Sequence, residues 1–402
     1  MAAFFSRKKD TVCGVVIEIG SGSVAASIVL SSCRNALPEM LYARREYMPI
    51  RRTSTPADRI RFMRRVLFAV MLDLERRGMA VLRKRGKRLR VERLLVSCAA
   101  PWSHTITQII RFEQDTPFIV TRRMVDEIIL RAYDTEETNT GEHAQVLADE
   151  GQHIVETAII DITLNGYSVQ APYNKEASEI AIAHLRGLVP THILIALEGI
   201  EKHIQGHRDM RIHTSAFILY CVLRDLYPQA TSACIVAVSE EATEIGLVQN
   251  GILYESMAVE YGMHSLIRDL AGFAKTIPEE AHAYLRAYKQ RVLTETQDKA
   301  LLRAQKRYVG FLEATIDELT KRYVLPRTMF LVLDQNAKQF FTDALESAIR
   351  DKGGHAQKTI VPLSSESTRD LITSPDETVG DPRLAITTRF FHKLHACGEM
   401  DN

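Results

Sequence analysis

The chain has 402 residues, of which 51 are Lys or Arg and 50 are Asp or Glu, and 46% are hydrophobic. This length allows two or more domains with substantial cores, and the balanced charge does not fit a general nucleic-acid binder. The six cysteines are scattered without paired spacing, which is typical of a reduced cytoplasmic protein without a zinc or disulfide framework. No stretch reaches the ~18 apolar residues of a membrane span, and the apolar start is too short for a signal peptide.

The opening of the chain predicts two strands joined by a tight turn. The strands are the apolar, β-branched stretches 13–19 and 24–31. The turn between them consists of Gly20, Ser21, Gly22 and Ser23. Its glycines permit a backbone whose N–H groups face inward as an anion nest, and its serines add hydroxyl donors. Glu18, just before the turn, could hold a magnesium ion through water. Taken alone, the stretch fits a phosphate loop and a plain hairpin equally well.

A third strand is predicted near 39–47, and a long helix over about 57–82, opened by Thr55 and Pro56. A basic run follows this helix, and its cations are Arg83, Lys84, Arg85, Lys87, Arg88 and Arg90. The functional alternatives are contact with anionic lipid headgroups or with a protein partner, and nucleic-acid binding. No aromatic residues interrupt the run, which weakens the nucleic-acid alternative. A solvated turn whose cations favour the helix C-terminus would require no function.

An α+β subdomain is predicted over 91–187, where strand-like runs enclose a helix at about 121–132. From about residue 233 the chain repeats the plan of its opening: a buried strand, a short turn, a second strand, a hairpin at Asn250 and Gly251, a third strand and a helix. The two copies begin about 220 residues apart. This repetition predicts two related lobes separated by an insert.

Duplicated β-hairpin units with an inserted subdomain resemble the actin-like ATPase fold, an α/β fold of duplicated ribonuclease-H-like lobes. Residues 18–23 resemble the first phosphate loop of that superfamily, with Glu18 where the family has Asp. The insert is similar to that of the FtsA family of bacterial cell-division actins, and a related insert occurs in the PilM family of type IV pilus assembly actins. The resemblance covers about residues 12–395, and it is more specific for the architecture than for the cellular system.

The resemblance implies a nucleotide site for ATP and magnesium, provided that binding is retained. The residues matching the family's phosphate loops are Glu18, Gly20, Ser21, Gly22, Ser23, Thr243 and Glu244. Magnesium would be held through Glu18, and only together with the nucleotide. We expect no further metal site, and we assign no catalytic residue.

The second phosphate loop departs from the family pattern. Ala237 stands where the family has Asp, and Ser239, Glu240 and Glu241 replace three glycines. A nucleotide would therefore meet two carboxylates in place of bare backbone N–H groups, and one like-charge pair at ~4 Å costs roughly 4 kcal/mol at an effective dielectric of ~20. In place of the adenosine-binding glycine pair stand Asp334, Gln335 and Asn336. We therefore expect a pseudo-ATPase with weak or absent ATP binding.

The resemblance also implies how the chain divides. The expected order is a first lobe, an inserted α+β subdomain, the rest of the first lobe, a second lobe and a C-terminal helix that returns to the first lobe. These segments are 12–90, 91–187, 188–230, 231–380 (with a helical subdomain at 278–325) and 381–397.

The expected function is that of an FtsA-like or PilM-like cytoplasmic scaffold, which recruits protein partners of a division or pilus assembly to the inner face of the cytoplasmic membrane. Self-association and peripheral membrane contact are further expectations, although the C-terminal amphipathic anchor of the FtsA family is not evident. The alternative is an active ATP-hydrolysing polymer protein. A second alternative is a nucleic-acid-associated protein that uses the basic run 83–90.

Overall fold

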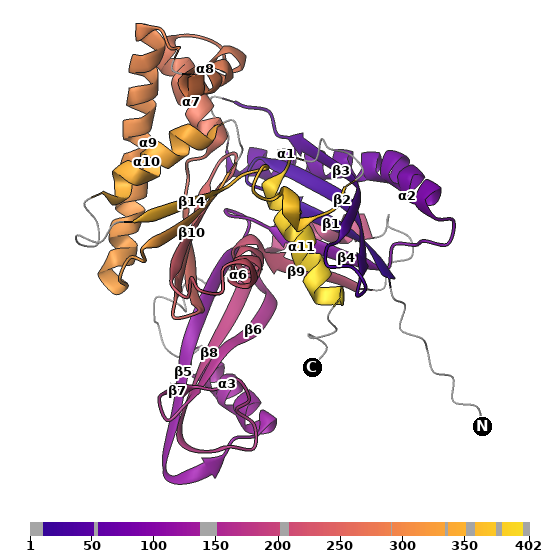
Figure 1. Ribbon diagram of the computed structural model, residues 1–402, viewed down its shortest axis with the longest axis vertical. Helices are drawn as coiled ribbons and strands as arrows, with labels where there is room; N and C mark the ends of the chain where they lie inside the picture. The colour runs from indigo at the N-terminus through magenta and orange to yellow at the C-terminus, as the bar shows by residue number, and fades with distance from the viewer. Residues whose placement is uncertain are drawn as a thin grey trace.

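The structure is a computed structural model, and its elements form two β-sheets with helices on their faces (Figure 1). It describes residues 11–51, 55–136, 151–201, 209–290, 292–333, 337–350, 358–374 and 380–396. The residues expected at the adenosine position, 334–336, lie outside these ranges, as does the end of the expected C-terminal segment at residue 397.

The first sheet has five strands in the order β3-β2-β1-β4-β9. They are β1 (Thr11–Ile19), β2 (Ser23–Ser32), β3 (Glu39–Tyr47), β4 (Arg93–Cys98) and β9 (Asp209–Thr214). β1 pairs antiparallel with β2 and parallel with β4. Because β4 belongs to this sheet, the expected start of the insert at residue 91 is corrected to a start after Cys98. The strand signal of residues 93–98 was local, and only the pairing partner shows to which sheet it belongs.

Helices cover both faces of the first sheet. Because successive side chains of β1 point to opposite faces, they enter two different cores. Val15 and Ile17 pack with α1, α2 and α5, whereas Val16 packs with α6 and α11. The helices are α1 (Pro56–Asp73), α2 (Met79–Arg85), α5 (Thr191–Glu201), α6 (Ser215–Leu226) and α11 (Pro382–Ala396). Gly14 of β1 allows the close approach of α11, since a Cβ there would lie 2.1 Å from the Phe391 ring.

The long helix predicted over 57–82 is interrupted. Thr55 begins α1 with a capping box, in which Thr55 and Asp58 exchange side-chain and backbone hydrogen bonds. A π-helical turn, Leu74–Gly78, then separates α1 from α2. At Gly78 a Cβ would lie 3.0 Å from the side chains of Ile28 and Tyr42, so the missing side chain lets this turn approach the sheet. The apolar periodicity predicted the helix, but it carried no signal for the extra residue of the π turn.

The second sheet repeats the plan of the first. β10 (Ala233–Val238) pairs antiparallel with β11 (Thr243–Gln249) and parallel with β13 (Thr328–Val332), as β1 does with β2 and β4. This confirms the duplicated unit that the sequence predicts. The remaining strands of this lobe are β12 (Ile252–Val259) and β14 (Thr359–Leu363). Its helices, which enclose one core, are α7 (Met263–Ala274), α8 (Pro278–Gln290), α9 (Glu295–Arg322) and α10 (Lys338–Ile349).

The inserted segment extends away from both lobes (Figure 1). Its elements are β5 (His104–Ile119), α3 (Arg122–Glu136), β6 (Gln152–Leu164), β7 (Tyr167–Ser168) and β8 (Glu176–Pro190). α3 packs on these strands around a separate apolar core. β5 also pairs with β12, where Glu255 faces Ile106, so the insert continues the second sheet into nine strands. A short 3₁₀ turn, Arg369–Leu371, precedes α11.

Candidate functional site

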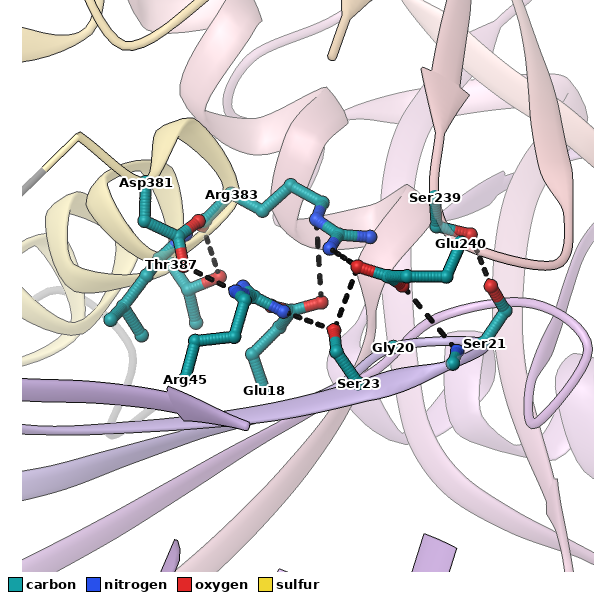
Figure 2. Close-up of polar contacts among 12 residues, drawn as sticks. Glu18, Gly20, Ser21, Ser23, Arg45, Ser239, Glu240, Asp381, Arg383 and Thr387 are labelled. Carbon is teal, nitrogen blue, oxygen red and sulfur yellow. Dashed lines mark hydrogen bonds and ion pairs between the residues drawn. The ribbon is translucent and has the colours of Figure 1, made fainter. Parts of the chain in front are cut away.

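Two hairpin turns, one from each lobe, meet face to face (Figure 2). The first joins β1 to β2 and contains Gly20, Ser21 and Gly22, and the second joins β10 to β11 over residues 239–242. The hydroxyl oxygens of Ser21 and Ser239 are hydrogen-bonded at 2.6 Å, and the backbone N–H of Glu241 donates to the Ser21 hydroxyl at 2.7 Å. The duplication thus brings together the two loops that the sequence predicts as a phosphate-binding pair.

The carboxylate of Glu240 lies in the anion nest of the first loop. It accepts hydrogen bonds from the Ser23 hydroxyl at 2.8 Å and from the backbone N–H of Gly22 at 3.4 Å. A Cβ on Gly22 would lie 2.6 Å from the Cβ of Glu240, so the absence of a side chain at position 22 permits this approach. The first loop does bind an anion, as its sequence predicts, but the anion belongs to the second loop of the same chain.

Two arginines complete the site from the far ends of the chain. Arg383, near the start of α11, donates to Glu240 at 2.7 Å and lies 3.7 Å from Glu18. Arg45 of β3 pairs with Glu18 and also donates to the Ser23 hydroxyl and to Asp381, both at 2.6 Å. We call Glu18, Glu240, Asp381, Arg45 and Arg383 the interlobe charge cluster. Four of these charges belong to the first lobe, and Glu240 enters them from the second lobe to pair with Arg383.

The charges of this cluster stabilise one another in a poorly solvated place. Burial opposes the ionisation of Glu240, but Arg383 and Arg45 outweigh it and hold the pKa of that carboxyl well below its ordinary value. The pKa of Asp381 is likewise lowered against burial, chiefly by Arg45. Burial also opposes the charge of Arg383, yet Glu18 and Glu240 raise its pKa. These groups are therefore charged at neutral pH, and the lobes are joined by the Arg383–Glu240 ion pair and by hydrogen bonds.

Glu241 does not point at the first loop as its neighbour does, which corrects the expectation that both glutamates would meet a phosphate. Its carboxylate accepts two hydrogen bonds from Arg268 of α7, at 2.8 and 2.6 Å. Burial opposes the ionisation of Glu241, but Arg268 and His264 outweigh it and lower the pKa of this carboxyl to about 2. Adjacent side chains of a tight turn leave in different directions, so one glutamate enters the nest and the other anchors the turn to α7.

The predicted nucleotide-binding residues Thr243 and Glu244 do not join the other loop residues. The Thr243 hydroxyl donates to the carbonyl oxygen of Tyr261 and lies 3.0 Å from the Tyr308 hydroxyl, inside the second lobe. Glu244 faces the opposite side of β11, where burial raises the pKa of its carboxyl to about 7. Both assignments came from the resemblance, and the register of β11 places both side chains in other surroundings.

The described residues do not fit ATP with magnesium. Glu18, the expected magnesium partner, is 1% exposed and already faces two guanidinium groups. Ala237, at the position of the family's Asp, pairs in register with Glu244 inside the sheet. A divalent cation would be repelled by Arg45 and Arg383, and a phosphate by Glu240. A cavity of about 800 Å³ remains beside the cluster, between β3, α7 and the start of α11.

Sequence reasoning missed Arg45, Asp381 and Arg383. Two glutamates in a phosphate loop do signal that buried cations are needed, because buried charges are paired. The chain offers 51 lysines and arginines, however, and no local pattern distinguishes the two that serve here.

The basic run lies at the end of α2 and is exposed, apart from Gly86 and Leu89. Arg85 pairs with Glu39 at 3.1 Å, and Arg90 donates to the carbonyl oxygens of Lys87 and Leu89. Within the described ranges, every helix is too short or too polar to span a bilayer.

No protein-family model and no curated protein matches the sequence. Solved structures do match. One is a chain of the PilM–PilN type IV pilus biogenesis complex, and the alignment covers 97% of this chain and 99% of that chain at 10% identity, with a TM-score of 0.58. An alignment with an ethanolamine utilization protein, EutJ from Carboxydothermus hydrogenoformans, covers 94% of this chain and 89% of EutJ at 10% identity, with a TM-score of 0.41. Together with the duplicated lobes, the first likeness establishes the fold: this chain has the actin-like ATPase fold.

Proposed function

We propose that the protein is a cytoplasmic scaffold of the actin-like fold, similar in role to FtsA or PilM, and that its nucleotide site is degenerate. The proposal depends on one observation: the Glu240 carboxylate takes the hydrogen-bond donors that a phosphate would need in the first loop. A phosphate could enter only by displacing an ion that is bonded to Ser23, Gly22 and Arg383. Efficient ATP hydrolysis is then not available to the protein.

The same contacts suggest what replaces nucleotide binding. In an ATP-binding member of the fold, the nucleotide would join the two phosphate loops. Here Ser21 bonds to Ser239, and Glu240 connects the second lobe to Ser23 and Arg383 of the first lobe directly. We propose that the internal carboxylate holds the lobes in one fixed arrangement, which suits a docking platform better than a polymer that cycles with hydrolysis.

Protein partners are proposed by analogy of fold. The PilM structure was solved as a PilM–PilN complex of type IV pilus biogenesis. We propose that this chain also recruits protein partners, of a pilus-type or division-type assembly, at the inner face of the cytoplasmic membrane. The inserted subdomain, which extends beyond both lobes, offers one docking surface (Figure 1).

Calorimetry with magnesium-ATP tests the degenerate site. We expect no binding by the unaltered protein below a dissociation constant of about 1 mM. Glu240→Gly removes the internal anion and leaves the Gly22 N–H, the Ser23 hydroxyl and two guanidinium groups facing the vacated space, so this variant should gain binding of ATP or inorganic phosphate. Adding Ala237→Asp supplies a carboxylate for magnesium and should favour magnesium-ATP further.

The matched control is Glu241→Gly, the same substitution one residue along, where the carboxylate bonds to Arg268. This control should gain no affinity. Micromolar binding by the unaltered protein would overturn the proposal and favour an active ATPase. Equal gains by the two glycine variants would show that loop flexibility, and not the removed Glu240 carboxylate, limits binding.

A further inference from the structure

A groove of about 770 Å³ lies between α1 and α5, on the side of the first sheet opposite α6 and α11. Its apolar lining includes Leu67, Phe68, Met71, Met79, Ile195 and Ile200. Phe68 is 58% exposed and Ile195 is 51% exposed, so two large apolar side chains stand open on its two walls. Isolated exposed apolar residues are ordinary, but apolar residues that line one groove indicate a contact surface.

The groove is formed by the interruption of the helix. The π turn adds one residue to a helical turn, which rotates the following residues by about 100° about the helix axis. Met79 and Arg83 of α2 thereby line the same groove as Leu67 and Met71 of α1. On the opposite wall, Gly199 of α5 has nothing within 4 Å of its Cβ position, so this wall is open.

The charge around the groove is positive. Arg64 and Arg83 line it beside one acidic residue, Glu75, and all three are exposed. Neither arginine forms an ion pair with another residue that the structure describes. Further exposed cations, Arg65 and Lys84, are next to them in the chain. Two arginines that form no ion pair within the described ranges, beside an apolar floor, complement a ligand that is apolar on one face and acidic on its flanks.

We infer that this groove binds an amphipathic helix with acidic flanks, supplied by a protein partner. The inference rests on the proposed scaffold function and names one of its docking sites. An apolar stripe at i, i+3, i+4 and i+7 would lie against Phe68, Met71 and Ile195, as in other helix-in-groove complexes. Glutamates or aspartates on either side of the stripe would meet Arg64 and Arg83.

A lipid bilayer fits the groove less well than a helix does. A membrane surface is broad and meets convex, protruding side chains, whereas the apolar lining here lies between two helices. The basic run beyond Arg83 would attract anionic lipid and acidic protein alike, so charge by itself does not distinguish them. The concave apolar lining favours the helix.

The test uses two synthetic helical peptides that share one leucine stripe and differ only in glutamate or lysine flanks. A fluorophore on Gly199→Cys, in a background with Cys33→Ser and Cys397→Ser, reports occupancy of the groove. The glutamate peptide should bind at least about tenfold more tightly than the lysine peptide. Arg64→Glu with Arg83→Glu should reverse this preference. Phe68→Ser and Ile195→Ser, both at exposed positions, should each weaken binding about tenfold while the melting temperature stays near that of the unaltered protein.

Lys87→Glu with Arg88→Glu is the matched control, because it makes the same change in net charge outside the groove lining. It should change the affinity by less than about threefold. Equal effects of the two double variants would overturn the inference, as would failure of the glutamate peptide to bind at about 1 mM. Binding to vesicles of phosphatidylserine and phosphatidylcholine that depends on Ile195, without peptide binding, would replace it by a membrane contact. Magnesium-ATP calorimetry tests the degenerate site independently of all these outcomes.

Discussion

Arg383→Met should destabilise the protein strongly, because it removes one of the two cations of the interlobe charge cluster. Glu240 and Glu18 would keep their buried positions, with side chains 6% and 1% exposed, and would share Arg45 alone. Methionine fills much of the volume of the arginine stem, so the main loss is the charge. Breaking a buried ion pair from one side costs about 3–5 kcal/mol, since the remaining charge stays without its partner.

This cost can be converted into a melting temperature. With an unfolding entropy of about 2.1 cal/mol/K per residue, a chain of 402 residues that unfolds as one unit should lose about 4–6 °C. Adding Glu240→Gln removes the orphaned charge, so the double variant should recover about half of the loss. The pKa of Glu240 is depressed in the folded protein, so the ion pair stabilises it above the ordinary value of 4.5. The difference between Arg383→Met and the unaltered protein should therefore shrink as the pH falls below 4.5.

Urea and thermal unfolding of the four proteins of this double-mutant cycle would measure the coupling. Lys393→Met is the matched control, because Lys393 lies on the same helix and pairs with Asp225 at 2.6 Å in a partly exposed position. This control should cost less than about 1 kcal/mol. The reasoning is refuted if Arg383→Met costs no more than Lys393→Met, or if Glu240→Gln adds to the loss.

Three further outcomes follow from local surroundings. Burial raises the pKa of Glu244 from 4.5 to about 7, so the folded state favours the protonated carboxyl. The free energy of unfolding should therefore fall by about 3 kcal/mol as the pH rises from 4.5 to 7. Glu244→Gln should abolish this loss, as measured by urea titrations at the two pH values. Gly262→Ala should lower the free energy of unfolding by about 1–3 kcal/mol, because its Cβ would lie 2.3 Å from the carbonyl oxygen of Ser239. Gly272→Ala has nothing within 4 Å of its Cβ position, so thermal unfolding of this control should be unchanged or show slight stabilisation. Replacing the six cations of the basic run 83–90 by Ser and Gln should leave the melting temperature nearly unchanged and weaken sedimentation with anionic vesicles; unfolding of this variant would show that the run is structural.

The plan of both lobes could be predicted from the sequence because it depends on local signals. Apolar β-branched runs, the turn at Gly20 and Gly22 and the hairpin at Asn250 and Gly251 each act within a few residues. Their repetition predicted the duplicated unit, and with the insert it predicted the fold. Local signals did not carry the π turn at Gly78, nor did they assign strand 93–98 to the first sheet, because both depend on what the segment packs against.

The phosphate loops divide in the same way. The sequence by itself determined that the first loop can form an anion nest, and its resemblance to the family showed that the second loop lacks the family's glycines. Only the tertiary structure decided that Glu240 fills the nest while Glu241 turns to Arg268. Arg45 and Arg383 both face the Glu18 carboxylate from positions more than 300 residues apart, through a sheet register and a helix docked on that sheet. A buried charge requires a partner, but only the folded chain decides which partner it meets.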